Sequence, residues 1–256
     1  MFPLYRLRRH PFGVEAFFRH SLVLTYAYPE ALLAPLLPPG LSLDTHRGFA
    51  FLAIALVQTR GLRPSWAPRG LGQDFFLSGY RVFSRFRDGS GRSLRGLRIL
   101  RSDADRRLMV CFGNLLTHYR YRKCDAEVRE QDGRLHVRIR TPRAEADLDV
   151  SADIATQAAA PPPGSPFADL LEARKFAGPL PFTFDYEAET HSIVRIEGQR
   201  ERWDPRPVAV EVRECSFLRR PPLAGVAPTL ANAFHIRDLP YRWRPGILEP
   251  LPKAGA

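Results

Sequence analysis

Short strand-like segments that meet at turn signals run through the chain, and this pattern most constrains its fold. Residues 75–86 and 93–103 flank RDGSG, and residues 118–130 and 134–141 meet at Asp132-Gly133. Turn residues between segments of alternating or apolar character are typical of antiparallel hairpins. Further strand candidates are residues 17–28, 41–62, 144–154, 181–189, 191–203, 207–218 and 233–246.

Helical patterns are few. PEALLAPLL (29–37) and PFADLLEARKFAG (166–178) predict short helices, and RLMVCFGNLL (107–116) fits either a strand or a helix. Strands do not alternate regularly with helices, so a doubly wound parallel sheet is disfavoured. We predict a mainly β protein with minor α content. It is a single domain over residues 1–256, folded as one large antiparallel sheet system that closes into a barrel.

Composition narrows the classes of function. The net charge of +11 and the 45% hydrophobic content suit a globular protein with a basic surface. Basic residues also suggest nucleic acid, but the arginines are spread over nearly every segment and no tail or helix concentrates them. Nucleic-acid binding is therefore disfavoured but kept as an alternative.

Three separated cysteines and the lack of a long apolar run indicate no disulfide framework and no membrane span. A cytoplasmic protein is expected, and a homo-oligomer is compatible with the sequence. Common catalytic motifs are missing: no phosphate-binding loop, no G-x-S-x-G elbow and no histidine pair at metal-binding helical spacing. We expect neither a metal nor a cofactor.

Several segments, in order, resemble the YqjF-like bacterial family of unknown function. They are YPEALLAPLLPPGLSLDTHRGFAFLAIALV, SGYRVFSRF, RGLRILRSDADRRLMV, HYRYRKCDAEV, HSIVRIEGQRERWDPRPVAVEV and YRWRPG. The resemblance covers most of residues 15–245. It implies the acetoacetate-decarboxylase-like fold, a large twisted β barrel around a cavity with a few peripheral helices.

Lysine is rare here: only Lys123, Lys175 and Lys253 occur, against 38 basic residues in all. In acetoacetate decarboxylase a strand lysine forms a Schiff base with the keto acid, and its amine must lose its proton to react. Strand parity puts Lys123 on the face of that lysine. It lies one or two pleats away, however, and shares the face with two acidic residues. Lys123 is thus the only catalytic candidate, and a solvated lysine is the favoured alternative.

Other candidates follow from polar residues that interrupt apolar strands. Arg81, within YRVF, could bind a ligand carboxylate, or it could lie on the outer barrel wall. An acid that the family carries four residues earlier is replaced by Leu77. Additional ligand-binding candidates are Tyr119, Tyr121, His118, Arg98 and His191.

The favoured hypothesis is a barrel that binds a small acidic or carbonyl-containing molecule in its lumen, with catalysis unassigned. The alternatives are a lysine Schiff-base lyase acting on a keto acid and a basic nucleic-acid-binding module.

Overall fold

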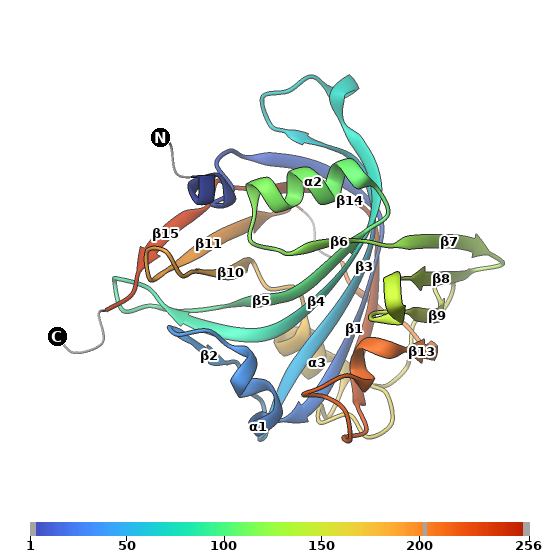
Figure 1. Ribbon diagram of the computed structural model, residues 1–256. Helices are drawn as coiled ribbons and strands as arrows, with labels where there is room; N and C mark the ends of the chain where they lie inside the picture. Colours follow the sequence, from blue (N-terminus) through green and yellow to red (C-terminus); the bar gives the residue numbers. More distant parts are fainter. Residues whose placement is uncertain (1–3, 202–203, 253–256) are drawn as a thin grey trace.

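The computed structural model describes residues 4–201 and 204–252, which form two β-sheets and three α-helices (Figure 1). Strands of the larger sheet are β1 (Val14–Pro29), β2 (Leu41–Leu43), β3 (Phe49–Pro64), β4 (Gln73–Arg87), β5 (Ser93–Ala104), β6 (Tyr121–Lys123), β10 (Phe182–Glu187), β11 (Ser192–Gln199), β12 (Arg206–Pro207), β14 (Thr229–Trp243) and β15 (Ile247–Pro250). The smaller sheet contains β7 (Asp125–Gln131), β8 (Arg134–Arg140), β9 (Leu148–Asp153) and β13 (Val210–Cys215). The helices are α1 (Glu30–Leu33), α2 (Arg107–Leu116) and α3 (Leu170–Ala177), with short 3-10 turns η1 (Leu4–Arg8), η2 (Ala34–Leu36), η3 (Arg69–Leu71), η4 (Pro142–Ala144) and η5 (Ser216–Arg219).

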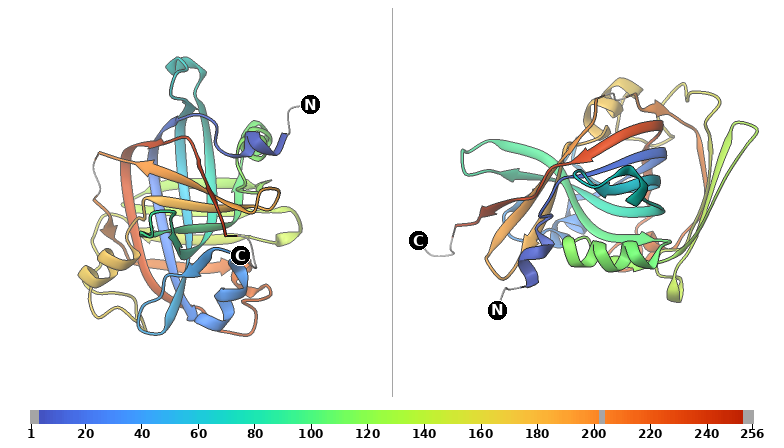
Figure 2. Two further views of the ribbon diagram at one scale, coloured as in Figure 1. Left: turned by 90° about the vertical axis from the view of Figure 1, so that its left-hand side faces the viewer. Right: turned by 90° about the horizontal axis from the view of Figure 1, so that it is seen from above.

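The larger sheet closes on itself. Its strands follow the order β12-β14-β1-β3-β4-β5-β10-β11-β15, and an additional pairing joins β11 to β14. Only Gly198↔Trp243 and Gln199↔Arg242 make this closing contact, whereas β1 pairs along most of its length with both β3 and β14. The predicted mainly β fold with a barrel-like ring of strands is therefore confirmed (Figure 2).

The ring is mixed, not wholly antiparallel as predicted. Strand β5 pairs in parallel with β10 and with β6, while the other pairings of the ring are antiparallel. Along the chain, α2, strands β7, β8 and β9 of the smaller sheet and α3 lie between β5 and β10. Only a tight hairpin forces neighbouring strands to run in opposite directions, so turn signals could not reveal this pairing.

Strand β3 is apolar on both faces because each face is buried against a different partner. Leu52, Ile54 and Leu56 point toward the smaller sheet and pack in one core with residues of β8 and β9. Ala53, Ala55 and Val57 point into the ring. The sequence of β3 therefore lacks the alternation of a strand with one wet face.

The segment 118–130 is not one strand, which corrects the sequence prediction. Strand β6 covers only Tyr121–Lys123 and pairs with β5, whereas β7 starts at Asp125 in the other sheet. Buried Cys124 lies at the switch between the two sheets. The ambiguous residues 107–116 form α2, which lies across the upper end of the ring (Figure 1). None of the described helices is long and apolar enough to cross a membrane.

Strands β5 and β10 lie so close together at Gly96 that one added methyl group should destabilise the fold. A Cβ on Gly96 would lie 2.5 Å from Phe184 Cε2 and 2.7 Å from the Phe182 carbonyl oxygen. Gly96→Ala should therefore lower the free energy of unfolding by about 1–3 kcal/mol in urea denaturation. Gly89→Ala is the control, because a Cβ there meets nothing within 4 Å; equal stability of the two variants would contradict the close approach of β5 and β10.

Candidate functional site

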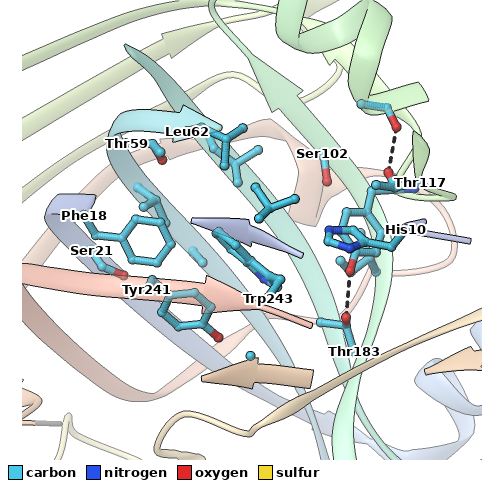
Figure 3. Close-up of a pocket in the computed structure, with 18 of the residues that line it drawn as sticks. His10, Phe18, Ser21, Thr59, Leu62, Ser102, Thr117, Thr183, Tyr241 and Trp243 are labelled. Carbon is cyan, nitrogen blue, oxygen red and sulfur yellow. Dashed lines mark hydrogen bonds between the residues drawn. The ribbon is translucent and has the colours of Figure 1, made fainter. Parts of the chain in front are cut away.

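A cavity of about 580 Å³ lies inside the ring. Side chains from β1, β3, β4, β5 and β14 line it, together with α2 and the segment 177–181. Most lining residues are apolar. In Figure 3, Phe18, Tyr241 and Trp243 lie on one side of the cavity, and His10, Thr117 and Thr183 lie on the other. The volume falls within the usual range of ligand pockets.

The charges of the lining are all of one sign. Among the described residues, no aspartate, glutamate or lysine lines the cavity, while Arg63, Arg81 and Arg200 do. Arg63 is paired, since its Nη2 donates to Glu15 Oε2 at 2.8 Å. Arg200 donates to the Pro179 carbonyl oxygen at 2.8 Å and to the Tyr241 hydroxyl at 3.4 Å.

Arg81 differs from the other two arginines. The structure records neither a hydrogen bond nor an ion pair for it within residues 4–201 and 204–252, and its buried Nε has no partner. Its guanidinium lies over Gly79, where a Cβ would come within 3.0 Å of both Nε and Nη2. Burial lowers the pKa of Arg81, and nearby Tyr241, Tyr119 and Tyr121 oppose that shift. The arginine that the sequence singled out therefore faces the cavity, and its role as a ligand anchor stays a prediction.

Tyr119 and Tyr121 are held at the cavity wall by α2 and its C-terminal turn. Asn114 forms two hydrogen bonds with the backbone of Tyr121, with its Oδ1 accepting at 2.7 Å and its Nδ2 donating at 2.8 Å. The Tyr121 ring fills the space beside Gly113, where a Cβ would lie 2.3 Å from the ring. Burial raises the pKa of both phenols, so each stays a neutral hydrogen-bonding group. The Tyr119 hydroxyl already bonds Thr183 Oγ1 at 2.7 Å.

The remaining predicted site residues do not line the cavity. Lys123 is partly exposed and donates from Nζ to Asp125 Oδ1 at 2.8 Å and to the Cys124 carbonyl oxygen at 2.6 Å. Arg98 is buried in an ion pair with Asp185, whose pKa burial raises to about 7. His118 lies 3.8 Å from Glu187, and His191 Nδ1 lies 2.9 Å from the Tyr186 hydroxyl. Two of these four residues thus have acidic partners far away in sequence.

Several cavity residues escaped the sequence analysis. Tyr241 and Trp243 come from the end of β14, and His10 comes from the segment before β1. The only available signal was the aromatic alternation of Tyr241 and Trp243, which puts both on one face of a strand. His10 gave none, because the segment before β1 is not a strand.

The rim of the cavity carries large apolar side chains that are exposed to solvent. Trp66 and Leu71, in the connection from β3 to β4, are 75% and 69% exposed. Phe112 and Leu115, on α2, are 47% and 41% exposed. All four also line the cavity. Figure 1 shows this connection and α2 at the same upper end of the ring.

Comparison with known proteins supports the fold. Residues 15–237 match the model of a family described as uncharacterized conserved proteins, which confirms the predicted family resemblance. No curated protein matches the sequence significantly.

Solved structures with the same fold are distant in sequence. The enduracididine biosynthesis enzyme MppR, in complex with pyruvate, aligns with a TM-score of 0.62 at 14% identity, over 93% of this chain and 90% of that one. An acetoacetate decarboxylase-like enzyme from Sphingomonas wittichii RW1 gives 0.59 at 12% identity, over 94% and 93%. Acetoacetate decarboxylase from Legionella pneumophila gives 0.58 at 11% identity, over 93% and 87%. These similarities establish the acetoacetate-decarboxylase-like fold.

The buried histidine of the cavity wall predicts a pH dependence of stability. Burial lowers the pKa of His10 to about 4, below its ordinary value of 6.5. The unfolded chain therefore binds one more proton between these values. The contribution of His10 to the free energy of unfolding is complete above pH 6.5. It is lost as the pH falls toward 4, at about 1.4 kcal/mol per pH unit. In His10→Gln, the free energy of unfolding measured by urea denaturation should fall less steeply between pH 6.5 and 4, by about 1.4 kcal/mol per pH unit. An unchanged slope would contradict the lowered pKa of His10.

Proposed function

This chain belongs to the DUF2071 family of uncharacterized conserved proteins, and from its cavity we propose that it binds a small organic anion, with Arg81 pairing to the ligand carboxylate. The observation that carries the proposal is that, within residues 4–201 and 204–252, the guanidinium of Arg81 has no partner and no acidic residue lines the cavity. A buried charge without a counter-charge costs stability. A ligand carboxylate supplies that counter-charge and accepts two parallel hydrogen bonds from the guanidinium fork.

The tyrosines complete a polar wall for such a ligand. Tyr119, Tyr121 and Tyr241 all line the cavity and lie near enough to Arg81 to affect its pKa. Their hydroxyls can donate to a second ligand oxygen, such as a carbonyl. The distant relative MppR has been solved in complex with pyruvate, a small carboxylate with a carbonyl group. That precedent supports an acid or keto acid as the class of ligand.

Lysine Schiff-base chemistry is the less favoured alternative. Lys123 and Lys175 do not line the cavity, and Lys253 lies outside the described residues. The amine of Lys123 is held by Asp125 next to solvent, and a nearby carboxylate favours the protonated, non-nucleophilic form of an amine. Binding without covalent catalysis therefore accounts better for the described residues.

Arg81→Met is expected to have opposite effects on binding and stability. Calorimetric titration measures the binding of butyrate, octanoate and pyruvate. For each of these acids that the wild-type protein binds, the affinity should fall at least about tenfold, because a charged hydrogen-bonding partner is lost. The free energy of unfolding should rise by about 1 kcal/mol, because an uncompensated and partly buried charge is removed.

The matched control is Arg87→Met. Arg87 lies further along the same strand, is exposed and donates to the Gly91 carbonyl oxygen. This variant should leave binding unchanged. Undiminished binding by Arg81→Met, with the variant folded by circular dichroism, would refute the anchor role.

Borohydride trapping addresses the Schiff-base alternative. Incubation with pyruvate or acetoacetate followed by borohydride should leave the intact mass of the protein unchanged, since no lysine among the described residues reaches the cavity. An adduct that forms in wild type and disappears in Lys123→Ala would restore the lyase hypothesis.

A further inference from the structure

The size and chemistry of the cavity are unsuited to a ligand as small as pyruvate. At about 30 Å³ for each water-sized group, 580 Å³ accommodates on the order of 19 non-hydrogen atoms. A three-carbon acid paired with Arg81 would leave most of this apolar volume unfilled. Unfilled apolar volume contributes no dispersion or burial energy to binding.

From these dimensions we propose that the ligand is an amphipathic monocarboxylate with an extended hydrocarbon body of about 10–16 carbon atoms. The inference rests on the proposed function, because it uses Arg81 as the anchor of the carboxylate. The guanidinium of Arg81 presents one fork, which matches one carboxylate.

The path of the hydrocarbon body follows β4. Gln73, Phe75 and Leu77 line the cavity between its rim and Arg81. Leu77 and Phe75 are four and six residues from Arg81 on this strand, which corresponds to about 13 and 20 Å at about 3.3 Å per residue and to the length of an extended acid of this size. Across from them, Ala55 and Val57 of β3 contribute further apolar surface to the lining. The distance and the lining suit a chain, not a compact acid.

Exposed apolar residues at the rim fit the same ligand. Trp66, Leu71, Phe112 and Leu115 line the cavity while remaining 41–75% exposed. Large apolar side chains gathered at a pocket mouth commonly mark a binding surface. Bound at Arg81 through its carboxylate, a long acid would reach these side chains with its terminal carbons and remove part of their surface from water.

A chain-length series tests the inference. The purified full chain is titrated calorimetrically with acetate, pyruvate, hexanoate, octanoate, decanoate and dodecanoate, each below its micellar concentration, and with methyl decanoate. Affinity should rise roughly tenfold for every two added methylenes, as expected when each enters apolar surroundings. Arg81→Met should weaken decanoate binding at least about tenfold while leaving methyl decanoate binding unchanged.

Two rim variants locate the end of the chain. Phe112→Ser should weaken dodecanoate binding about fivefold and octanoate binding far less. Leu108→Ser is the matched control, because Leu108 lies one turn earlier on α2 and is 60% exposed but does not line the cavity. It should change neither affinity, and equal effects of the two variants would overturn the proposed path of the hydrocarbon chain.

The outcomes separate the two proposals. If pyruvate or acetate binds as tightly as decanoate and binding depends on Arg81, the amphipathic ligand is refuted and the proposed function survives. If no carboxylate binds, or if folded Arg81→Met binds all of them as wild type does, both proposals fail.

Discussion

An arginine inside a closed ring of strands, for which the described part of the chain provides no counter-charge, is the feature on which this account of the protein depends. Arg81 lies on β4, whose neighbours β3 and β5 pair with it along most of its length. The ring continues through β10, β11, β14 and β1, so Arg81 lies at a largely apolar cavity, with its side chain partly exposed and its Nε buried. In such surroundings its electrostatic interactions are stronger than in water, and so is the cost of leaving it unpaired.

Other buried positions show how this chain satisfies an arginine with a structural role. Arg101 donates from Nε to buried Asp103 and from Nη1 to Glu145 at 2.8 Å. Fully buried Asp44 accepts from both Arg85 and Arg95. A structural arginine at the position of Arg81 would be expected to have a similar acidic partner. Leu77, four residues before Arg81 on the same strand, lines the cavity and offers no acidic partner. This contrast with arginines whose partners belong to the protein supports the proposal that Arg81 binds a ligand.

The chain shows which features a sequence can predict and which it cannot. Turn residues and alternation predicted the long strands and the barrel, because hairpin pairing is local in sequence, whereas the family fold was predicted from the resemblance of several segments to a known family. The parallel β5–β10 pairing and the short closure between β11 and β14 depend on contacts between distant segments, which leave no local pattern. The candidate site divides in the same way. Arg81 and Arg98 both interrupt apolar strands, yet one faces the cavity and the other pairs with Asp185 on β10. The β4–β5 pairing also has a register shift between Tyr80 and Arg81, which makes it still harder to deduce from strand alternation which way the Arg81 side chain points.

A crystal structure of the protein grown with decanoate would test the central claim most directly. We predict electron density for the acid inside the ring, with both carboxylate oxygens about 2.7–2.9 Å from the Arg81 guanidinium and the hydrocarbon chain directed toward the rim formed by Trp66, Leu71, Phe112 and Leu115. A carboxylate bound at the rim or on the outer surface, with Arg81 still unpaired, would contradict the account.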